Sequence, residues 1–357
     1  MNGIDSVNSV EGEGDTPGIG AYPLDSLLIR TDQRTVHDVL RRTEKGFFIL
    51  DPEFQRDFVW EPQRQSRLIE SILMRIPLPV FYLAENPDGK LVVVDGLQRL
   101  STLRRFVAGE LKLNLDNPEL NGRTFATLPP KLQNRVEDSQ LTLYIVDAKV
   151  PERVRLDIFE RVNSGKPLTR QQMRNALYQG PATAFLKNEA NSQPFLAATA
   201  QALNRLDMRD REAVNRFVAF RLLGWRTYAD DMDEHLAEGL RRLNGISEDE
   251  RVTLGSVFEA SMRANLAVFG KHAFRKHDAE QTSRKVLNLS LFDVFSVGFA
   301  QFPEEAISLR ADPIRKMFYQ LMADEHFVRD ITYATSNKER VQGRFEIVEN
   351  HLAEVMA

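Results

Sequence analysis

The run Asp95-Gly96-Leu97-Gln98-Arg99, directly after the apolar residues 91–94, is the strongest candidate for chemistry. The pattern predicts a buried strand that ends in a carboxylate, a sharp turn at Gly96, and then a helix. The unpaired amides of a helix start attract anions, and Arg99 adds a planar donor fork that suits phosphate. Asp95 would then hold a magnesium ion or orient a water beside that phosphate. A purely structural reading, in which Asp95 caps the helix and Arg99 pairs with a surface acid, stays open.

A second candidate is the segment Phe54-Gln55-Arg56-Asp57-Phe58-Val59-Trp60, in which an arginine stands between aromatic residues. We expect extended, partly buried backbone here, and a buried arginine needs a carboxylate or a bound phosphate as its partner. Taken alone, the segment favours an ion pair of Arg56 with a nearby acid and a core position for Trp60.

A third candidate is the run Asn163-Ser164-Gly165-Lys166, between helices expected over 151–162 and 169–178. Consecutive small polar residues can turn their amides toward an anion, with Lys166 as a point charge. A plain joint, in which Gly165 ends one helix and Thr169 caps the next, is the more frequent use of such a pattern. It is not a Walker loop, because proline follows Lys166 and no glycine stands five residues before Gly165.

A basic stretch lies further along the chain and could contact phosphate backbones, although such a run is more often a solvated helix face. Its members are Arg263, Lys271, Arg275, Lys276, Arg284 and Lys285. None of the six histidines forms a close metal-ligand pair on one helix face. His272 and His277 are five residues apart, which would point them in different directions on a helix.

The composition excludes several classes of protein. The 357 residues include no cysteine, which rules out a disulfide scaffold, a thiolate nucleophile, an iron–sulfur cluster and cysteine-ligated zinc. The formal charge of −4 predicts neither nucleic-acid nor membrane binding, so any such surface must be local. The first twenty residues carry four acids and no Lys or Arg, unlike a secretory signal, and the apolar region 287–302 is too short for a membrane span. We therefore expect a soluble, cytoplasmic protein.

The periodicity predicts an α+β fold followed by an all-helical part. Helices are expected over 35–45, 63–74, 97–107, 151–162 and 169–178, and strands over 47–50, 80–84, 91–94 and 141–146. Residues 109–135 are expected to be rich in loops, and helical spacing continues nearly throughout after residue 180. The expected organisation is a disordered tail over 1–20, an α+β domain over 21–180 and a helical domain over 181–357.

Together and in this order, the motifs resemble the GmrSD-type restriction endonuclease N-terminal domain, a family with a ParB/sulfiredoxin-like fold. The resemblance runs from about Tyr22 to Gln179. It rests on Phe54-Gln55-Arg56 with Val59-Trp60, Leu68-Ile69-Glu70-Ser71-Ile72-Leu73 leading to Ile76-Pro77-Leu78-Pro79, Val94 to Arg99 with Thr102-Leu103, and Phe159 to Gly165. The run from Thr335-Ser336-Asn337 to Arg344 is also similar to the close of the family's helical region.

The resemblance implies NTP binding and hydrolysis in prokaryotic defence, with GTP as the favoured nucleotide and Mg²⁺ as the metal. The implied catalytic residues are Asp95, Gln98 and Arg99, with Asp95 also as the metal ligand. The implied nucleotide-binding residues are Gln55, Arg56, Gly96, Ser101, Thr102, Asn163, Ser164, Gly165 and Lys166. Two positions depart from the family pattern: Leu97 replaces a common glutamine, which weakens the case for hydrolysis more than for binding, and Lys166 replaces a common glycine.

Many members of this family carry a C-terminal HNH nuclease module, which needs a histidine base with Asn and His metal ligands. No such cluster stands beyond residue 180. The leading expectation is therefore an NTP-dependent sensor or regulatory subunit that acts with a separate nuclease or another DNA-acting partner. One alternative is a DNA-binding module without hydrolysis that uses residues 263–285. Another is a self-contained metal-dependent nuclease, which is disfavoured because Asp95 is the only clear metal-binding carboxylate in the motif.

Overall fold

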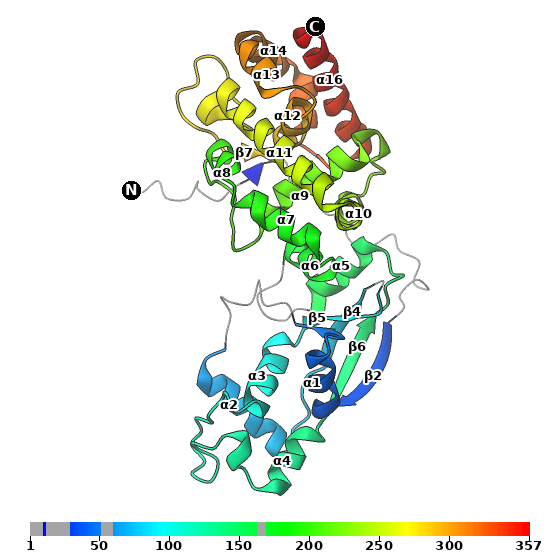
Figure 1. The fold of residues 1–357 in the computed structure, drawn as a ribbon, viewed down its shortest axis with the longest axis vertical. Helices are drawn as coiled ribbons and strands as arrows, with labels where there is room; N and C mark the ends of the chain where they lie inside the picture. Colours follow the sequence, from blue (N-terminus) through cyan, green and yellow to red (C-terminus); the bar gives the residue numbers. More distant parts are fainter. Residues whose placement is uncertain (1–9, 12–28, 51–59, 87, 163–168) are drawn as a thin grey trace. The chain divides into compact units, whose positions relative to one another are not determined.

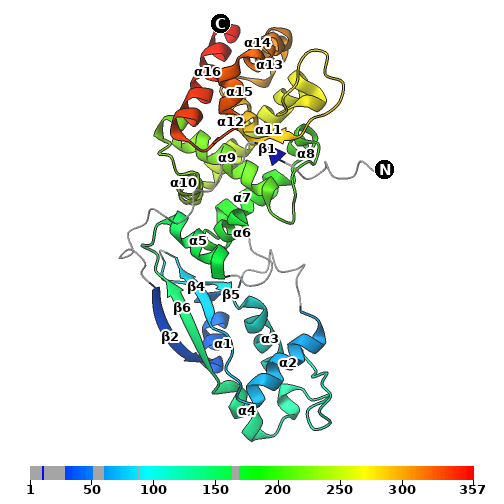
Figure 2. The ribbon, with the colours of Figure 1, turned by 180° about the vertical axis from the view of Figure 1, so that it is seen from behind.

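The computed structural model describes residues 10–11, 29–50, 60–86, 88–162 and 169–357. It confirms an α+β fold and divides into two compact units (Figures 1 and 2). Residues 19–168 form the first, here called the α/β unit. Residues 1–18 and 169–357 form the second, the helical unit.

The division falls after Leu168, whereas we expected the helical domain to begin at residue 181. The reason is local. The Thr169 hydroxyl donates a hydrogen bond of 2.8 Å to the carbonyl of Asp207, and the Gln172 amide donates one of 2.8 Å to the carbonyl of Leu206. Helix α6 (Arg170–Leu177) is therefore fixed to the helical unit from its first turn.

The α/β unit is built on one five-stranded sheet in the order β2-β6-β4-β5-β3. The strands are β2 (Ile29–Thr35), β3 (Phe48–Ile49), β4 (Phe81–Glu85), β5 (Leu91–Asp95) and β6 (Gln140–Val146). The expected hairpin is confirmed as the antiparallel pair β4–β5, while β6 runs parallel to β4. The end of β5 therefore lies beside the start of β4, where Asp95 pairs in register with Tyr82.

Helices cover both faces of this sheet. Leu91 and Val93 join the core that they share with α1 (Val36–Glu44), α2 (Pro62–Leu73), α3 (Leu97–Val107) and α4 (Pro130–Glu137). Because side chains alternate along a strand, Val92 and Val94 face the other way. They are buried too, and α5 (Glu152–Val162) contacts β4 and β5. Because β5 is buried on both faces, it rigidly supports the turn that follows it at Gly96.

Sequence reasoning missed two elements of this unit. Strand β2 pairs with β6 along its whole length, yet its residues IRTDQRT show no apolar alternation, because it is a largely exposed edge strand. Helix α4 begins within the region 109–135 that we expected to be loop-rich. Its start at Pro130 suits a helix, since proline is tolerated in the first turn, but the Pro129-Pro130 pair also reads as a loop signal.

After α6, the described part of the helical unit contains ten further α-helices. They are α7 (Pro181–Ala190), α8 (Gln193–Thr199), α9 (Arg209–Leu223), α10 (Met232–Gly245), α11 (Glu248–Phe269), α12 (Leu289–Phe299), α13 (Glu304–Leu309), α14 (Ala311–Ala323), α15 (Glu325–Asp330) and α16 (Lys338–Met356). In the expected disordered tail, β1 (Val10–Glu11) instead pairs in parallel with β7 (Leu287–Asn288). Among the described helices, none has the length and apolar character needed to cross a membrane.

A buried ion network joins α9, α12 and α16. Asp293, fully buried, accepts two hydrogen bonds from Arg216, of 2.8 and 2.6 Å, and one of 3.2 Å from Arg344. Arg344 also donates to the carbonyl of Thr335 at 2.6 Å. Burial lowers the pKa of Arg344 to about 10, although Asp293 opposes that shift. Thr335 and Arg344, which belong to the C-terminal part of the resemblance, are therefore bonded to each other inside the helical core.

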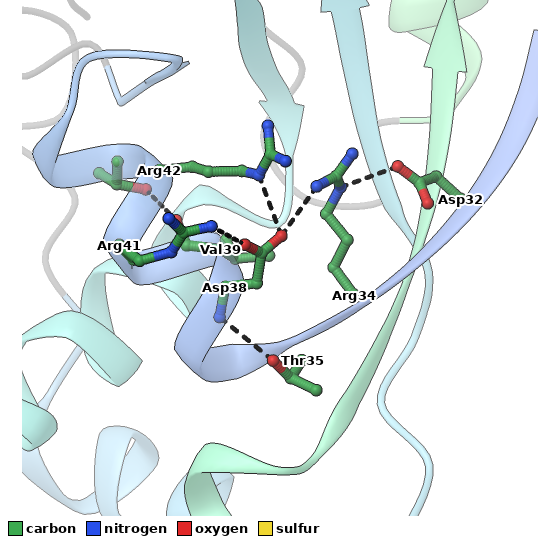
Figure 3. A network of polar contacts seen from close by, with 8 residues as sticks. Asp32, Arg34, Thr35, Asp38, Val39, Arg41 and Arg42 are labelled. Atoms are coloured by element: carbon green, nitrogen blue, oxygen red, sulfur yellow. Dashed lines mark hydrogen bonds and ion pairs between the residues drawn. The ribbon is translucent and has the colours of Figure 1, made fainter.

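A second network fixes the corner between β2 and α1 (Figure 3). The Asp38 carboxylate accepts hydrogen bonds from Arg41 at 2.6 Å, from Arg34 at 2.8 Å and from Arg42 at 3.0 Å. Asp32 accepts a further bond from Arg34 at 2.8 Å. The bonds from Arg41 and Arg34 hold the pKa of Asp38 well below its usual range.

We predict that Asp38→Asn lowers the free energy of unfolding at pH 7 by about 1 kcal/mol, because three partly exposed ion pairs are lost. A carboxylate with a lowered pKa in the folded state stabilises the fold only while it is ionised. The gap between wild type and variant should therefore narrow as the pH falls below about 4. Urea unfolding at pH 7 and pH 3 checks this, with Glu44→Gln, an exposed position of the same helix, as the control. An equal gap at both pH values would contradict it.

Candidate functional site

The turn between β5 and α3 has a backbone that only glycine fits. Gly96 adopts a φ of +96°, in the left-handed region. A Cβ atom at this position would stand 2.2 Å from Cδ1 of Phe81, far closer than atoms can approach. Gly96 is also the N-cap residue of α3, so this helix has no side-chain cap, and Asp95 does not play that part. The predicted strand, turn and helix are confirmed.

Arg99 folds back from α3 onto this turn. Its Nη2 donates hydrogen bonds to Oδ2 of Asp95 at 2.8 Å and to the carbonyl of Val80 at 3.1 Å, while Nη1 donates to the carbonyl of Pro79. Its guanidinium carbon lies 4.3 Å from the ring centroid of Phe81. Arg99 thus ties the end of β5 to the chain that enters β4.

Arg99 is buried, with 8% of its surface exposed, so it does not form the surface ion pair that the structural reading proposed. Burial lowers the pKa of Arg99, and the nearby Asp95 opposes that shift. An arginine keeps its charge at neutral pH even so. The turn therefore holds a permanent cation beside a carboxylate whose side chain is 24% exposed.

The remaining predicted residues of α3 have different partners. Gln98 accepts a hydrogen bond of 3.2 Å from the backbone N–H of Trp60. The buried Thr102 hydroxyl donates to the carbonyl of Gln98 at 2.7 Å, so it is engaged within its own helix. Ser101 is half-buried. Leu97, at the position of the missing glutamine, is 7% exposed and belongs to the hydrophobic core.

The other predicted residues lie outside the described part of the chain. Gln55 and Arg56 fall within residues 51–59, and Asn163, Ser164, Gly165 and Lys166 fall within residues 163–168. Of the sequence-predicted set, the structure therefore brings together Asp95, Gly96 and Arg99.

Sequence reasoning missed a polar cluster around Trp60. The Trp60 carbonyl accepts a hydrogen bond from the side-chain amide of Gln65, whose oxygen accepts one of 3.0 Å from Arg105. The guanidinium carbon of Arg64 lies 4.3 Å from the Trp60 ring centroid. The one signal available in the sequence was the spacing of Gln98 and Arg105, which places them on one face of α3 two turns apart.

A comparison with known families decides what this part of the chain is. The sequence profile of the GmrSD restriction endonuclease N-terminal domain matches residues 36–179. This segment belongs to that family. No curated protein matches the chain. The GmrSD domain therefore contains the whole Asp95 turn and indicates a component of a restriction or anti-phage system.

A second group of charges is buried in helix α5 of the GmrSD domain. Glu152, Arg155 and Asp157 are all buried, and Nη1 of Arg155 lies 3.7 Å from a carboxylate oxygen of Glu152. Nε and Nη2 of Arg155 have no hydrogen-bond partner among the described residues. Their burial could not be predicted from the sequence, because charges in an amphipathic helix normally face solvent.

The GmrSD domain also has a surface cleft of about 500 Å³ between the end of α2, α4 and the start of β6. Of the predicted site residues that the structure describes, none lines this cleft. In the parts of the chain that the structure describes, no group of three or more His, Asp or Glu side chains could hold a metal ion.

The basic stretch over 263–285 is not one solvated face. Arg263 pairs with Glu304 at 2.9 Å, and Arg275 is buried and donates to the carbonyl of Thr199 at 2.7 Å. Lys276 binds Glu11 and, at 2.6 Å, the hydroxyl of Thr332. Three of its six cations are therefore engaged within the helical unit.

The expectation that His272 and His277 point in different directions is wrong. Their rings stack with centroids 4.8 Å apart. The spacing argument assumed a helix, but α11 ends at Phe269 and only a short 3₁₀ turn follows. Burial lowers the pKa of both rings.

We predict that Gly96→Ala destabilises the GmrSD domain by more than about 1 kcal/mol, for two reasons. Alanine would have to adopt a left-handed backbone conformation, and its Cβ atom would clash with the Phe81 ring. Gly46→Ala is the matched control. It also has a positive φ, of +73°, but no atom lies within 4 Å of the added Cβ. Urea unfolding of both variants checks the prediction. Equal losses would mean that backbone strain alone, and not the Phe81 contact, requires glycine at position 96.

Proposed function

We propose that this protein is an NTP-binding sensor or regulatory subunit of a prokaryotic restriction or anti-phage system. It acts with a separate nuclease or another DNA-acting partner. The observation that carries the proposal is the turn of the GmrSD domain, where a buried cation, a partly exposed carboxylate and an uncapped helix start come together.

The helix start is the part of the turn that suits a phosphate group. Gly96 offers no side chain to the first amides of α3, and the positive end of the helix dipole favours an anion there. Three of the five N–H donors of Arg99 are engaged with Asp95, Val80 and Pro79. Arg99 would therefore act on a phosphate through its charge and its remaining donors while it keeps the turn in shape.

A magnesium ion fits the turn as a partner of the nucleotide. Mg²⁺ is commonly held by one or two carboxylates together with substrate phosphates, so Asp95 suffices as a single protein ligand. When bound, the ion would neutralise charge on the phosphates. The residues of this chain would hold the turn, present the carboxylate and bind the phosphate. GTP is the favoured nucleotide through the family resemblance.

Beyond binding, the protein would also hydrolyse the nucleotide, and this step would depend on Asp95 and Gln98. Leu97 belongs to the hydrophobic core, so it offers no polar group that could position a water. We therefore expect turnover to be slow compared with binding, as suits a sensor that must persist in its bound state.

We predict that Arg99→Ala weakens nucleotide binding about 10- to 100-fold, since a hydrogen bond to a charged group contributes roughly 1.5–3 kcal/mol. Calorimetry with GTP and ATP in the presence of Mg²⁺ measures the effect. Arg104→Ala, an exposed arginine of the same helix, is the control. Circular dichroism must show that the variant is folded, because Arg99 also holds β4 to β5. Unchanged affinity in a folded Arg99→Ala protein would remove the assigned site.

A separate prediction concerns the alternative of a self-contained nuclease. The purified protein should not cut DNA with Mg²⁺ or Mn²⁺, because the described residues offer no cluster of metal-binding carboxylates or histidines. Incubation with plasmid DNA, followed by gel electrophoresis, checks this. Reproducible cleavage that disappears in Asp95→Ala would favour the nuclease instead.

The DNA-binding alternative would use residues 263–285. Its support is limited to Lys271, Arg284 and Lys285, which are exposed, since the other three cations of the stretch have internal partners. A gel-shift assay with the triple Lys271→Ala, Arg284→Ala, Lys285→Ala variant would separate this function from nucleotide binding.

A further inference from the structure

We infer that the cleft between α2, α4 and β6 is a docking surface for an acidic segment of a partner protein, with carboxylates on both sides of an apolar side chain. The inference goes beyond the proposed nucleotide site and rests on the proposed function only for the existence of a partner. Every residue that lines the cleft belongs to a described part of the α/β unit. The surface can therefore be tested without nucleotide.

Three segments of the chain form the walls of the cleft. They are the end of α2 with residues 75–78, helix α4, and the start of β6 with the turn before it. Helices α2 and α4 lie side by side (Figures 1 and 2). Strand β6 extends beyond β4 at this end, because residues 140–142 pair with β2, while the pairing with β4 begins at Leu143. The volume of about 500 Å³ lies within the range of known ligand sites.

The lining of the cleft carries a net positive charge. Arg75, Lys131 and Arg135 stand against one acid of the lining, Asp138. None of the three cations forms an ion pair with another described residue. Arg135 donates a hydrogen bond of 2.7 Å to the carbonyl of Leu73, at the end of α2, while Arg75 and Lys131 are exposed. Carboxylates of a partner would therefore supply the complementary charge.

Apolar side chains line the cleft beside these cations. Ile72 and Leu141 are buried, whereas Ile76 has 49% of its surface exposed. Met74, two residues before Ile76, is 64% exposed. Single exposed apolar residues are ordinary on a protein surface, but neighbouring ones beside a cleft indicate contact with another molecule. The phosphate backbone of DNA offers these side chains no apolar group, so the cleft suits a protein segment better than DNA.

Arg75 has a backbone conformation that normally belongs to glycine. Its φ is +61°, directly after Met74, the C-cap residue of α2. The N–H of Arg75 donates to the carbonyl of Ile72 at 2.9 Å, and the N–H of Ile76 donates to that of Ser71 at 2.9 Å. These two bonds define a Schellman motif, in which glycine is the favoured residue at this position. An arginine is less stable there, because its Cβ crowds the following carbonyl.

The side chain of Arg75 does not compensate for this strain inside the fold. It is exposed and forms no hydrogen bond or ion pair with the rest of the described chain. Strained residues of this kind are found mainly at functional sites, where the strain is part of the mechanism. Arg75 therefore supports a binding role for the cleft that it lines.

The test begins with a displayed library of random short peptides, selected against the full chain. We expect the enriched peptides to carry acidic residues on both sides of an aliphatic one. Their affinities are then measured by fluorescence anisotropy with labelled peptides, and a short labelled DNA duplex is measured in parallel. A selection without enrichment, or enriched peptides without acidic residues, would overturn the docking surface.

We expect the double variant Arg75→Gly, Lys131→Ala to bind the enriched peptides about 4- to 25-fold more weakly, since each exposed ion pair contributes about two- to fivefold. The double variant Arg67→Ala, Arg104→Ala removes two exposed arginines outside the cleft and should bind like the wild type. Equal affinities of the two double variants would contradict the proposal. So would binding of the DNA duplex, in place of peptides, that is lost in the first double variant.

Arg75→Gly alone separates binding from folding. It should keep or raise the urea midpoint of unfolding, because glycine relieves the left-handed strain, while it weakens peptide binding about two- to fivefold. A lower midpoint would mean that Arg75 stabilises the domain, and would overturn its binding role. Because no nucleotide is present, a failure of the proposed nucleotide site would leave these results unchanged.

Discussion

The buried pairing of Arg99 with Asp95 over the Phe81 ring is the interaction on which the GmrSD domain's candidate site depends. The guanidinium joins the end of β5 to the backbone that enters β4, and the ring beneath it leaves no room for a side chain at position 96. Asp95, Gly96, Arg99 and Phe81 are therefore one structural unit, and none can change independently. The turn keeps one shape because these four residues fill one another's space.

The sequence predicted the elements that carry this unit, because their signals are local. The apolar run over 91–94, the glycine and the helix that follows are all visible within fifteen residues. The hairpin partner β4 was also visible from its turn residues. Strand β2 was not, since an exposed edge strand needs no apolar alternation and is defined only by its pairing with β6.

The partners of the site residues were beyond sequence reasoning for a different reason. Gln98 and Trp60 are 38 positions apart, and nothing local to either indicates that one accepts a hydrogen bond from the other. The error over His272 and His277 has a related cause. Residue spacing gives directions only within a regular helix, and α11 ends before both histidines. Patterns thus predict which residues share an element, while contacts between elements depend on the packing of the whole unit.

Both units contain a buried arginine that is paired with an aspartate, but the two aspartates differ in their exposure to solvent. In the helical unit, Asp293 has no exposed surface and is shared by Arg216 and Arg344. Its carboxylate links three helices and is not accessible to a ligand. At the turn, the cation is buried but the Asp95 side chain keeps about a quarter of its surface in solvent. A buried pair that lost one partner would leave an uncompensated charge, which makes both pairs costly to break. At the turn, that rigidity holds in place a carboxylate that a ligand can still reach, and this combination separates a candidate binding site from a structural ion pair.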